Sequence, residues 1–468
     1  MPIATLNPDI LALIASYVPR ITIAAMMQVG RVFYHECPKV LLRDGASLED
    51  DENIVKFVRF IRAEDGTRAR YLTTLDLSFT EGDVISDDSA QLLAECLRSL
   101  SFETLRGLSI AAAEETFRAH PCLLAALQTL TTVQDLAVDE CGPLSCTLVK
   151  ALAPGMHAIT LAYDNDADTD AVPVEQVHPL VLLQGSRDTL KTVELTFMSR
   201  PLPRSLYPEP YPNVHEFWIG WCSYTDLSPY IHAFPNLQSL TFDATYDEMD
   251  LHGLEPLVQQ RLPNRKAQLE HGSWKALATV CGAVGDLYVS GLTCPVQLLA
   301  LVMKDETHEM LRDVLNDTRP SVLSLRSGRA GALDAATGLP AVFAALGAGN
   351  MKVLKLDLDI PPEDRDTDVS AGLGNLLSSL KGMALQSLEL TFTCFELPEC
   401  MSGERFGMES VLPLCPVERY LEDVDVDALG RQCLAEVPTL ENAQIMIRGH
   451  RTRRHGTAVV KRANPQQD

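Results

Sequence analysis

The side chains best spaced for chemistry are four aspartates that alternate along one short acidic stretch: Asp164, Asp166, Asp168 and Asp170. Alternating carboxylates bind Ca²⁺ in the EF-hand loop, but that loop also needs a central glycine and a terminal glutamate. Both are missing from this stretch. We therefore interpret it as a solvated turn and expect no metal site.

The motifs that mark common enzyme sites are also missing. The chain has no G-x-x-x-x-G-K-[ST] or G-x-G-x-x-G loop for phosphates, no G-x-S-x-G nucleophile turn and no H-E-x-x-H zinc helix. Its 11 histidines are scattered, and its 12 cysteines contain no C-x-x-C pair, the closest being Cys141/Cys146 and Cys394/Cys400. We expect reduced thiols, no cofactor, no catalytic residue and no enzyme activity.

Composition narrows the class of partner. The chain has 468 residues, of which 46% are hydrophobic and 22% charged, as is ordinary for a globular protein with an ample core. The net charge of −24 argues against nucleic acid or an anionic membrane surface as a partner. With no secretion signal and no apolar run long enough to span a membrane, we expect a cytoplasmic or nuclear protein without a membrane partner.

A short internal repeat shows which elements could position a binding surface. The pattern apolar-x-x-apolar-x-apolar, as in Leu72-x-x-Leu75-x-Leu77, recurs mostly some 23 to 36 residues apart. Such a spacing predicts stacked repeats. Full or shortened copies begin at Leu72, Leu105, Val133, Met156, Leu190, Val214, Leu237, Val284, Leu323, Met351, Leu385 and Ile445.

Helical patterns lie between these expected strands. They cover 90–100, 122–130, 147–152, 274–280, 310–315, 341–346 and 373–380. One strand and one helix per unit resembles the leucine-rich repeat, although the asparagine usual in its turn is largely missing. This resemblance implies an α/β solenoid, an irregular horseshoe with a parallel inner sheet and outer helices, in which stacking buries the apolar side of each unit. An ordinary α/β domain with parallel strands is the alternative.

Outward strand positions define the expected partner-binding face. Because side chains alternate along a strand, Leu75 and Leu77 point into the solenoid while Asp76 and Ser78 point out. The same alternation selects a face of acids, bases and aromatics that we expect to bind an unknown protein: Asp76, Ser78, Glu194, Trp218, Tyr288, Arg326, Lys355, Asp357 and Glu389.

The first forty-odd residues predict three short helices ahead of the repeats. Asn7 can cap the first helix, whose apolar stripe begins at Ile10 and reaches Val18. A second helix should end at Gly30, and a third should run from Arg31 until Pro38 breaks it. Because fewer than about 40 residues rarely form a sufficient core, we expect some of this apolar surface to dock on something else.

This stretch resembles the F-box of fungal F-box-like proteins with leucine-rich repeats. The resemblance is carried by Leu6, Pro8, Asp9-Ile10-Leu11, Ile14, Tyr17-Val18, Val29-Gly-Arg31-Val-Phe33-Tyr34 and Leu41. It departs from the family in the Asn between Leu6 and Pro8, and in Phe33 where Trp is common. It implies binding to a Skp-type adaptor and a cullin scaffold through Leu6, Pro8, Ile10, Leu11, Ile14, Val18, Met27, Val29 and Phe33.

Two functions from different classes fit these features. One is the substrate-recognition subunit of a cullin–RING (SCF-type) ubiquitin ligase. The other is a stand-alone acidic repeat scaffold or inhibitor of a basic protein, in which the head is only a helical cap. The expected domains are an F-box-like motif (1–45), a capping helix and linker (46–70), the repeats (71–448), and a basic tail (449–468) interpreted as disordered or as a nuclear import signal.

Overall fold

The structure is a computed structural model. It describes residues 8–79, 85–163, 172–197, 200–220, 226–243, 254–303, 307–328, 330–346, 349–394, 413–450, 452–453 and 456–462. The chain divides into two compact units. The first contains the residues up to Phe217, and the second contains most of those that follow.

The first unit begins with three helices, α1 (Pro8–Ala15), α2 (Arg20–Val29) and α3 (Arg31–Arg43), which we call the head. Its strands are β1 (Ala46–Leu48), β2 (Thr74–Leu77), β3 (Gly107–Ile110), β4 (Asp135–Cys141), β5 (Ala158–Tyr163) and β6 (Thr192–Thr196). These strands pair in chain order, and each pair is parallel. The other helical segments include α4 (Asp51–Arg62), η1 (Ala63–Tyr71), α5 (Asp87–Ser99), α6 (Ala113–Ala119), α7 (Pro121–Leu127), α8 (Pro143–Leu152), α9 (Val174–Val177) and α10 (Pro179–Leu182).

The second unit continues the same alternation. The division falls within β7 (Glu216–Gly220) and α11 (Ser228–Ala233). Its strands are β8 (Ser239–Asp243), β9 (Leu277–Ala283), β10 (Val296–Met303), β11 (Val322–Ser327), β12 (Val353–Asp359), β13 (Ser387–Thr393), β14 (Asn442–Arg448) and β15 (Gly456–Lys461). Neighbouring pairs are parallel except β14 with β15. Its helices are α12 (Leu254–His271), α13 (Val284–Ser290), α14 (His308–Thr318), α15 (Leu339–Leu346), α16 (Val369–Leu380), α17 (Pro416–Asp423) and α18 (Val426–Glu436).

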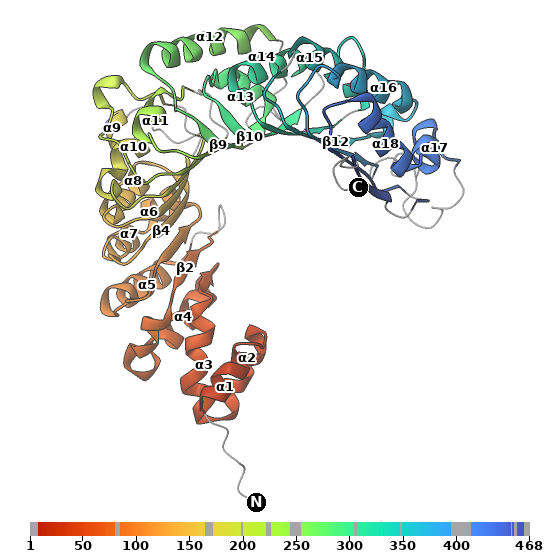
Figure 1. The fold of residues 1–468 in the computed structure, drawn as a ribbon. Helices are drawn as coiled ribbons and strands as arrows, with labels where there is room; N and C mark the ends of the chain where they lie inside the picture. Colours follow the sequence, from red (N-terminus) through yellow and green to blue (C-terminus); the bar gives the residue numbers. More distant parts are fainter. Residues whose placement is uncertain are drawn as a thin grey trace, which may run out of the picture. The chain divides into compact units, whose positions relative to one another are not determined.

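The repeated leucines form the core, as their spacing predicts. Leu75 and Leu77 are fully buried, and their partners in the next strand, Leu108 and Ile110, are nearly so. In each unit the helices cover one side of the sheet and leave the other side open (Figure 1). The chain is therefore an α/β leucine-rich-repeat solenoid.

In one repeat, the structure has a strand where the sequence pattern predicts a helix, and a helix where the pattern predicts a strand. The expected strand at 284–289 is helix α13, and the expected helix at 274–280 is largely strand β9. Apolar residues three apart, such as Val284 and Leu287, satisfy a helix as well as the repeat pattern. Every residue of α13 is buried, so no polar face reveals its period. The sequence pattern also missed β10.

Helix α3 continues through Pro38 instead of breaking there. A proline inside a helix leaves the carbonyl four residues earlier, that of Tyr34, without its usual donor. The Arg68 guanidinium donates a hydrogen bond to this carbonyl over 3.4 Å. The replacement donor comes from a residue 34 positions away, which local sequence cannot reveal.

The C-terminal region also differs from expectation. Residues 456–461, assigned to a disordered tail, form β15 and pair with β14. Ahead of β14, residues 426–436 form helix α18. Within the described ranges, no helix combines the length and apolar character needed to cross a membrane.

Candidate functional site

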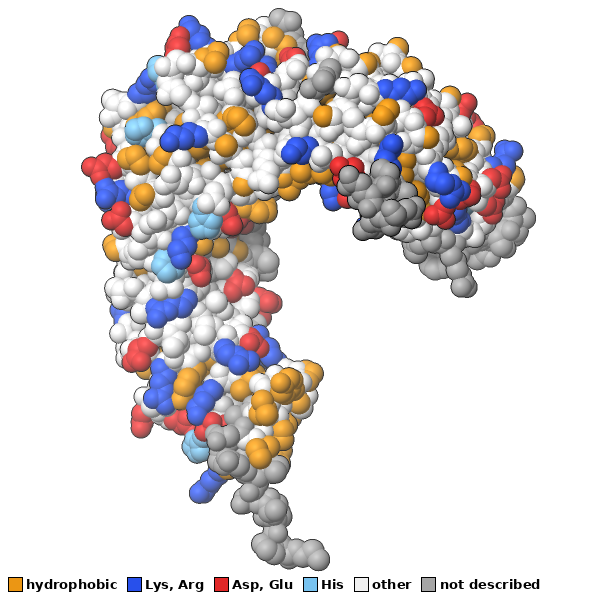
Figure 2. Space-filling model, viewed as in Figure 1, with side chains coloured by type: hydrophobic (Ala, Val, Ile, Leu, Met, Phe, Trp, Pro, Cys, Tyr) orange, Lys and Arg blue, Asp and Glu red, His pale blue; other side chains and the backbone are white. Residues whose placement is uncertain are grey.

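The head exposes an unusual amount of apolar surface. Of the 13 large hydrophobic side chains exposed in the described part of the chain, 8 lie between residues 10 and 34: Ile10, Leu13, Ile14, Tyr17, Ile21, Val29, Val32 and Tyr34. Figure 2 shows hydrophobic side chains gathered over the head. Contiguous apolar patches of this kind mark sites of protein or membrane interaction.

The exposed side chains of α1 form one stripe. Ile10, Leu13 and Ile14 are spaced at i, i+3 and i+4, which places them on the same side of the helix, and Tyr17 follows in the turn after it. Tyr17 is 82% exposed although it is aromatic. The stripe therefore presents a surface that another protein could cover.

Helix α2 extends this surface at both of its ends. Ile21 in its first turn is 82% exposed, and Val29 at its last residue is 81% exposed. Neither side chain packs in the buried core of the head, so substitution of either residue should cost the fold little.

The other face of the head forms a small core of its own. Ala15, Ile23 and Cys37 are buried there, and Val18, Met27 and Phe33 pack against them as partly buried side chains. The sequence interpretation treated Val18 as part of the same stripe as Ile10. The structure separates them, because Val18 packs against this core while Ile10 remains exposed.

The predicted adaptor-binding residues thus fall into three groups. Ile10, Ile14 and Val29 are exposed. Val18, Met27 and Phe33 belong to the head core. Leu6 and the side chains of Pro8 and Leu11 lie outside the described residues. The predicted set did not include Leu13, Tyr17, Ile21, Val32 and Tyr34, of which Leu13 could have been found from the helical spacing alone.

The buried Arg68 ties the head to the first repeats. Its guanidinium lies 4.5 Å from the ring centroid of Tyr34 in α3 and 4.6 Å from that of Phe60 in α4. Glu64 accepts a hydrogen bond from Arg68 over 3.4 Å and also pairs with His35 of α3. The position between two aromatic rings removes the guanidinium from water, and cation–π contacts with both rings stabilise it there.

The open sheet face of the first unit carries three of the predicted partner-binding residues. Asp76 and Ser78 are half-buried at β2, and the Ser47 hydroxyl lies 3.3 Å from an Asp76 carboxylate oxygen. Glu194 on β6 accepts a hydrogen bond from Thr160 over 3.1 Å. These side chains point away from the helices, as strand alternation predicts.

On the open sheet face of the second unit, the charged side chains of β11 to β13 form ion pairs and hydrogen bonds with one another and with Thr393. Arg326 lies 2.8 Å from Asp359, and Lys355 lies 2.9 Å from Glu389. Asp357 accepts a hydrogen bond from Thr393 over 3.0 Å. Each predicted residue here therefore has a partner within the same sheet.

Two aromatic residues predicted on the partner-binding face have different outcomes. Trp218 on β7 is 43% exposed, as expected of a residue on that face. Tyr288 is buried in α13, with the Arg261 guanidinium 4.3 Å from its ring centroid. The assignment of Tyr288 to the binding face was wrong because its segment is a helix.

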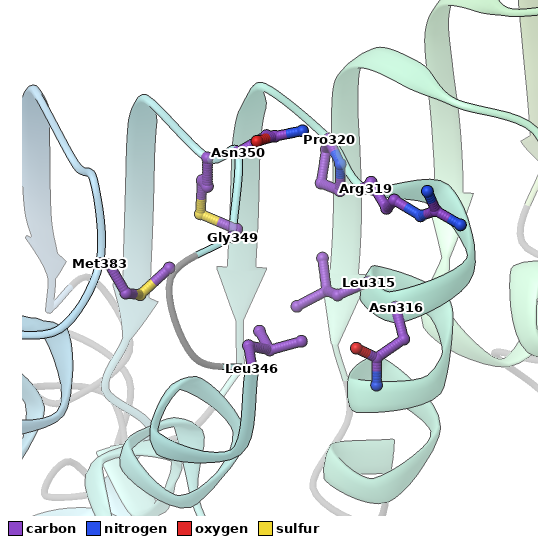
Figure 3. Close-up of a pocket in the computed structure, with 9 residues that line it drawn as sticks. Leu315, Asn316, Arg319, Pro320, Leu346, Gly349, Asn350 and Met383 are labelled. Atoms are coloured by element: carbon purple, nitrogen blue, oxygen red, sulfur yellow. The ribbon is translucent and has the colours of Figure 1, made fainter.

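A hollow of about 240 Å³ lies where α14 ends and the following strands begin. Figure 3 shows Leu315 and Leu346 at its apolar base, with Asn316, Arg319 and Asn350 around it. No residue predicted as a site from the sequence lies in it.

The described residues were also compared with the requirements of metal sites and disulfides. Among the described residues, no group of three or more His, Cys, Asp or Glu side chains could hold a metal ion. The aspartates at 164–170 lie outside those residues. The cysteines that the structure describes are free thiols, and burial raises the pKa of Cys294, Cys394 and Cys433 to about 12 in each case.

Comparisons with known proteins show only loose likenesses. No protein-family model and no curated protein matches the chain. A solved structure of the Rad7 and Elc1 complex in yeast aligns at 13% identity and a TM-score of 0.31, covering 88% of this chain and 97% of that one. A TLR13–ssRNA13 complex aligns at 15% identity and a TM-score of 0.29, covering 81% and 58% respectively. Identities and TM-scores this low say nothing about what this chain binds.

Proposed function

We propose that this protein is the substrate-recognition subunit of a cullin–RING ubiquitin ligase. Its head binds a Skp-type adaptor, and the open face of its repeats binds a protein substrate. The chain then acts by proximity, raising the effective concentration of substrate near the subunits that transfer ubiquitin.

The exposed apolar surface of the head carries this proposal. Burying apolar area contributes about 25 cal/mol per Å², so a stripe left in water costs stability that a partner recovers on binding. The stripe on α1 and the exposed ends of α2 face away from the head core, so a partner can cover them without unfolding the head. The resemblance of the head to an F-box supports a Skp-type adaptor as that partner.

Capture of a Skp-type adaptor by the full chain tests the proposal. The test variant is Tyr17→Asp, Ile21→Asp and Val29→Asp together, because all three residues are more than four-fifths exposed. Placing carboxylates in an apolar interface should weaken binding by at least about a hundredfold, since central anchors cost about 2 kcal/mol or more each.

A matched control makes the same change elsewhere. Leu262→Asp and Leu269→Asp alter two exposed leucines on α12, 62% and 70% exposed, and should leave adaptor binding unchanged. The proposal would be contradicted if the wild-type chain did not bind the adaptor. It would also be contradicted if the test variant bound the adaptor as tightly as the wild type does. A lowered urea midpoint in the test variant would instead identify the surface as part of the fold.

A further inference from the structure

The open face of strands β2 to β5 contains a shallow hollow of about 240 Å³. Its floor is lined by small side chains: Gly107, Ser109, Ala137, Ala158 and Thr160. Because these side chains are short, another chain can approach the sheet closely there. No described element covers this side of the sheet (Figure 1).

Every charged side chain that points outward from β2 to β6 is acidic. Asp76 and Asp135 border the hollow, while Asp139 on β4 and Glu194 on β6 extend the acidic surface beyond it. Among the described residues, no Lys or Arg forms an ion pair with any of these four carboxylates. Their negative charge is therefore available to a partner.

The second unit shows that this is not a general property of the repeat face. There, Arg326 and Lys355 lie on the open face within 3 Å of Asp359 and Glu389 respectively. These two carboxylates are neutralised within the sheet, while Asp357 beside them accepts a hydrogen bond from Thr393. In β2 to β6, by contrast, none of the four outward carboxylates that the structure describes has a cation beside it, and two of them border the hollow of small residues.

We propose that the open face of β2 to β6 binds an extended, basic segment of a protein, whose Lys or Arg side chains reach Asp76, Asp135, Asp139 and Glu194. Strands about 4.8 Å apart make the five-strand face about 19 Å wide, which an extended segment of about six residues crosses. Arg is favoured because its planar guanidinium can bind a carboxylate through two hydrogen bonds. This inference deepens the proposed function by naming the class of substrate segment, but it uses a different surface from the head.

Fluorescence anisotropy with the full chain tests the inference. The probes are two labelled peptides of equal length, one of alternating arginine and serine and the other of alternating glutamate and serine. We expect the arginine peptide alone to bind, and its affinity to fall as added salt shortens the screening length. Binding of both peptides, or of neither, would overturn the inference.

Charge variants separate this face from the overall negative charge. Asp76→Asn, Asp135→Asn and Asp139→Asn together should weaken binding of the arginine peptide about tenfold, because each exposed ion pair contributes modestly. Three exposed helical acids supply the control, as Glu95→Gln, Glu115→Gln and Glu175→Gln. This control removes the same charge and should change affinity less than twofold; an equal loss would show non-specific attraction.

A steric variant and an assay of self-association complete the test. Ala137→Lys places a bulky cation in the hollow and should abolish binding of the arginine peptide. A concentration-dependent dimer in sedimentation, lost in Ala137→Lys, would identify a second copy of the chain as the occupant and overturn the inference. Adaptor capture by these variants should stay at the wild-type level, so failure here is distinguishable from failure of the proposed function.

Discussion

A buried glutamate caps a helix of the neighbouring repeat, and its removal should have a measurable cost. The Glu114 carboxylate on α6 accepts hydrogen bonds from the backbone N–H groups of Leu144 and Ser145 over 2.9 and 3.0 Å, and from the Ser145 hydroxyl over 3.2 Å. Helix α8 needs this cap because its N-cap residue, Gly142, has no side chain to supply one.

The cost follows from the number of orphaned donors. A hydrogen bond to a charged acceptor contributes about 1.5–3 kcal/mol, and loss of a helix cap costs about 0.5–2 kcal/mol. For Glu114→Ala, which leaves two backbone N–H groups unpaired, we expect the free energy of unfolding to fall by about 3 kcal/mol. Gln keeps one acceptor oxygen without the charge, so Glu114→Gln should cost about half as much.

Gly142 offers a sharper test of the same contact. A Cβ atom at this position would lie 2.5 Å from the carboxyl carbon of Glu114, which its hydrogen bonds hold in place. Gly142→Ala should therefore cost about 1–3 kcal/mol in the wild type. It should cost almost nothing in the Glu114→Ala background, where the space is free. The two changes should thus be strongly non-additive.

Urea unfolding of the four proteins, followed by circular dichroism, measures this coupling. A coupling energy near zero would refute the reasoning, because it would mean that Glu114 does not occupy the space beside Gly142. An unchanged midpoint for Glu114→Ala would refute the capping role itself.

Two further predictions concern other buried polar groups. Arg68→Met removes the cation between the Tyr34 and Phe60 rings and the donor to the Tyr34 carbonyl. This change should destabilise the head by about 2 kcal/mol. Amide hydrogen exchange in α3 should therefore become faster, and an unchanged exchange rate in α3 would contradict the prediction. Burial, with a smaller effect of Arg200, lowers the pKa of His178 to about 3. Because the unfolded His178 titrates near 6.5, its stabilising effect is complete above that pH and is lost as pH falls toward 3; at pH 5 the loss is about 2 kcal/mol. In the His178→Asn variant, the urea midpoint should not show this loss of stability between pH 6.5 and pH 3. If the urea midpoints of the variant and the wild type had the same pH dependence, the prediction would be contradicted.

The repeat architecture could be predicted because its signal is local. In segments such as Leu75–Leu77, alternation alone states which side chains share a face, and those leucines are buried as predicted. The assignment failed at 284–290, where every position is buried and apolar spacing suits a helix equally well. There the neighbouring elements, and not the periodicity, decide between strand and helix.

The candidate site on the head was only partly predictable, for a related reason. Helical spacing shows that Ile10 and Ile14 share a side of α1, but not whether that side faces α3 or water. The structure buries Ala15 and packs Val18 against the head core, which leaves Ile10 and Ile14 exposed.

The sequence by itself determined the repeating pattern of inward leucines and the presence of three short apolar helices ahead of it. Both follow from the periods of side-chain direction along a single segment. Only the tertiary structure decided which apolar residues stay exposed, how Arg68 supplies a donor for the carbonyl that Pro38 leaves open, and which acids lack a cation. Each of these depends on contacts between residues far apart in the chain, and a local pattern carries no information about the distance between them.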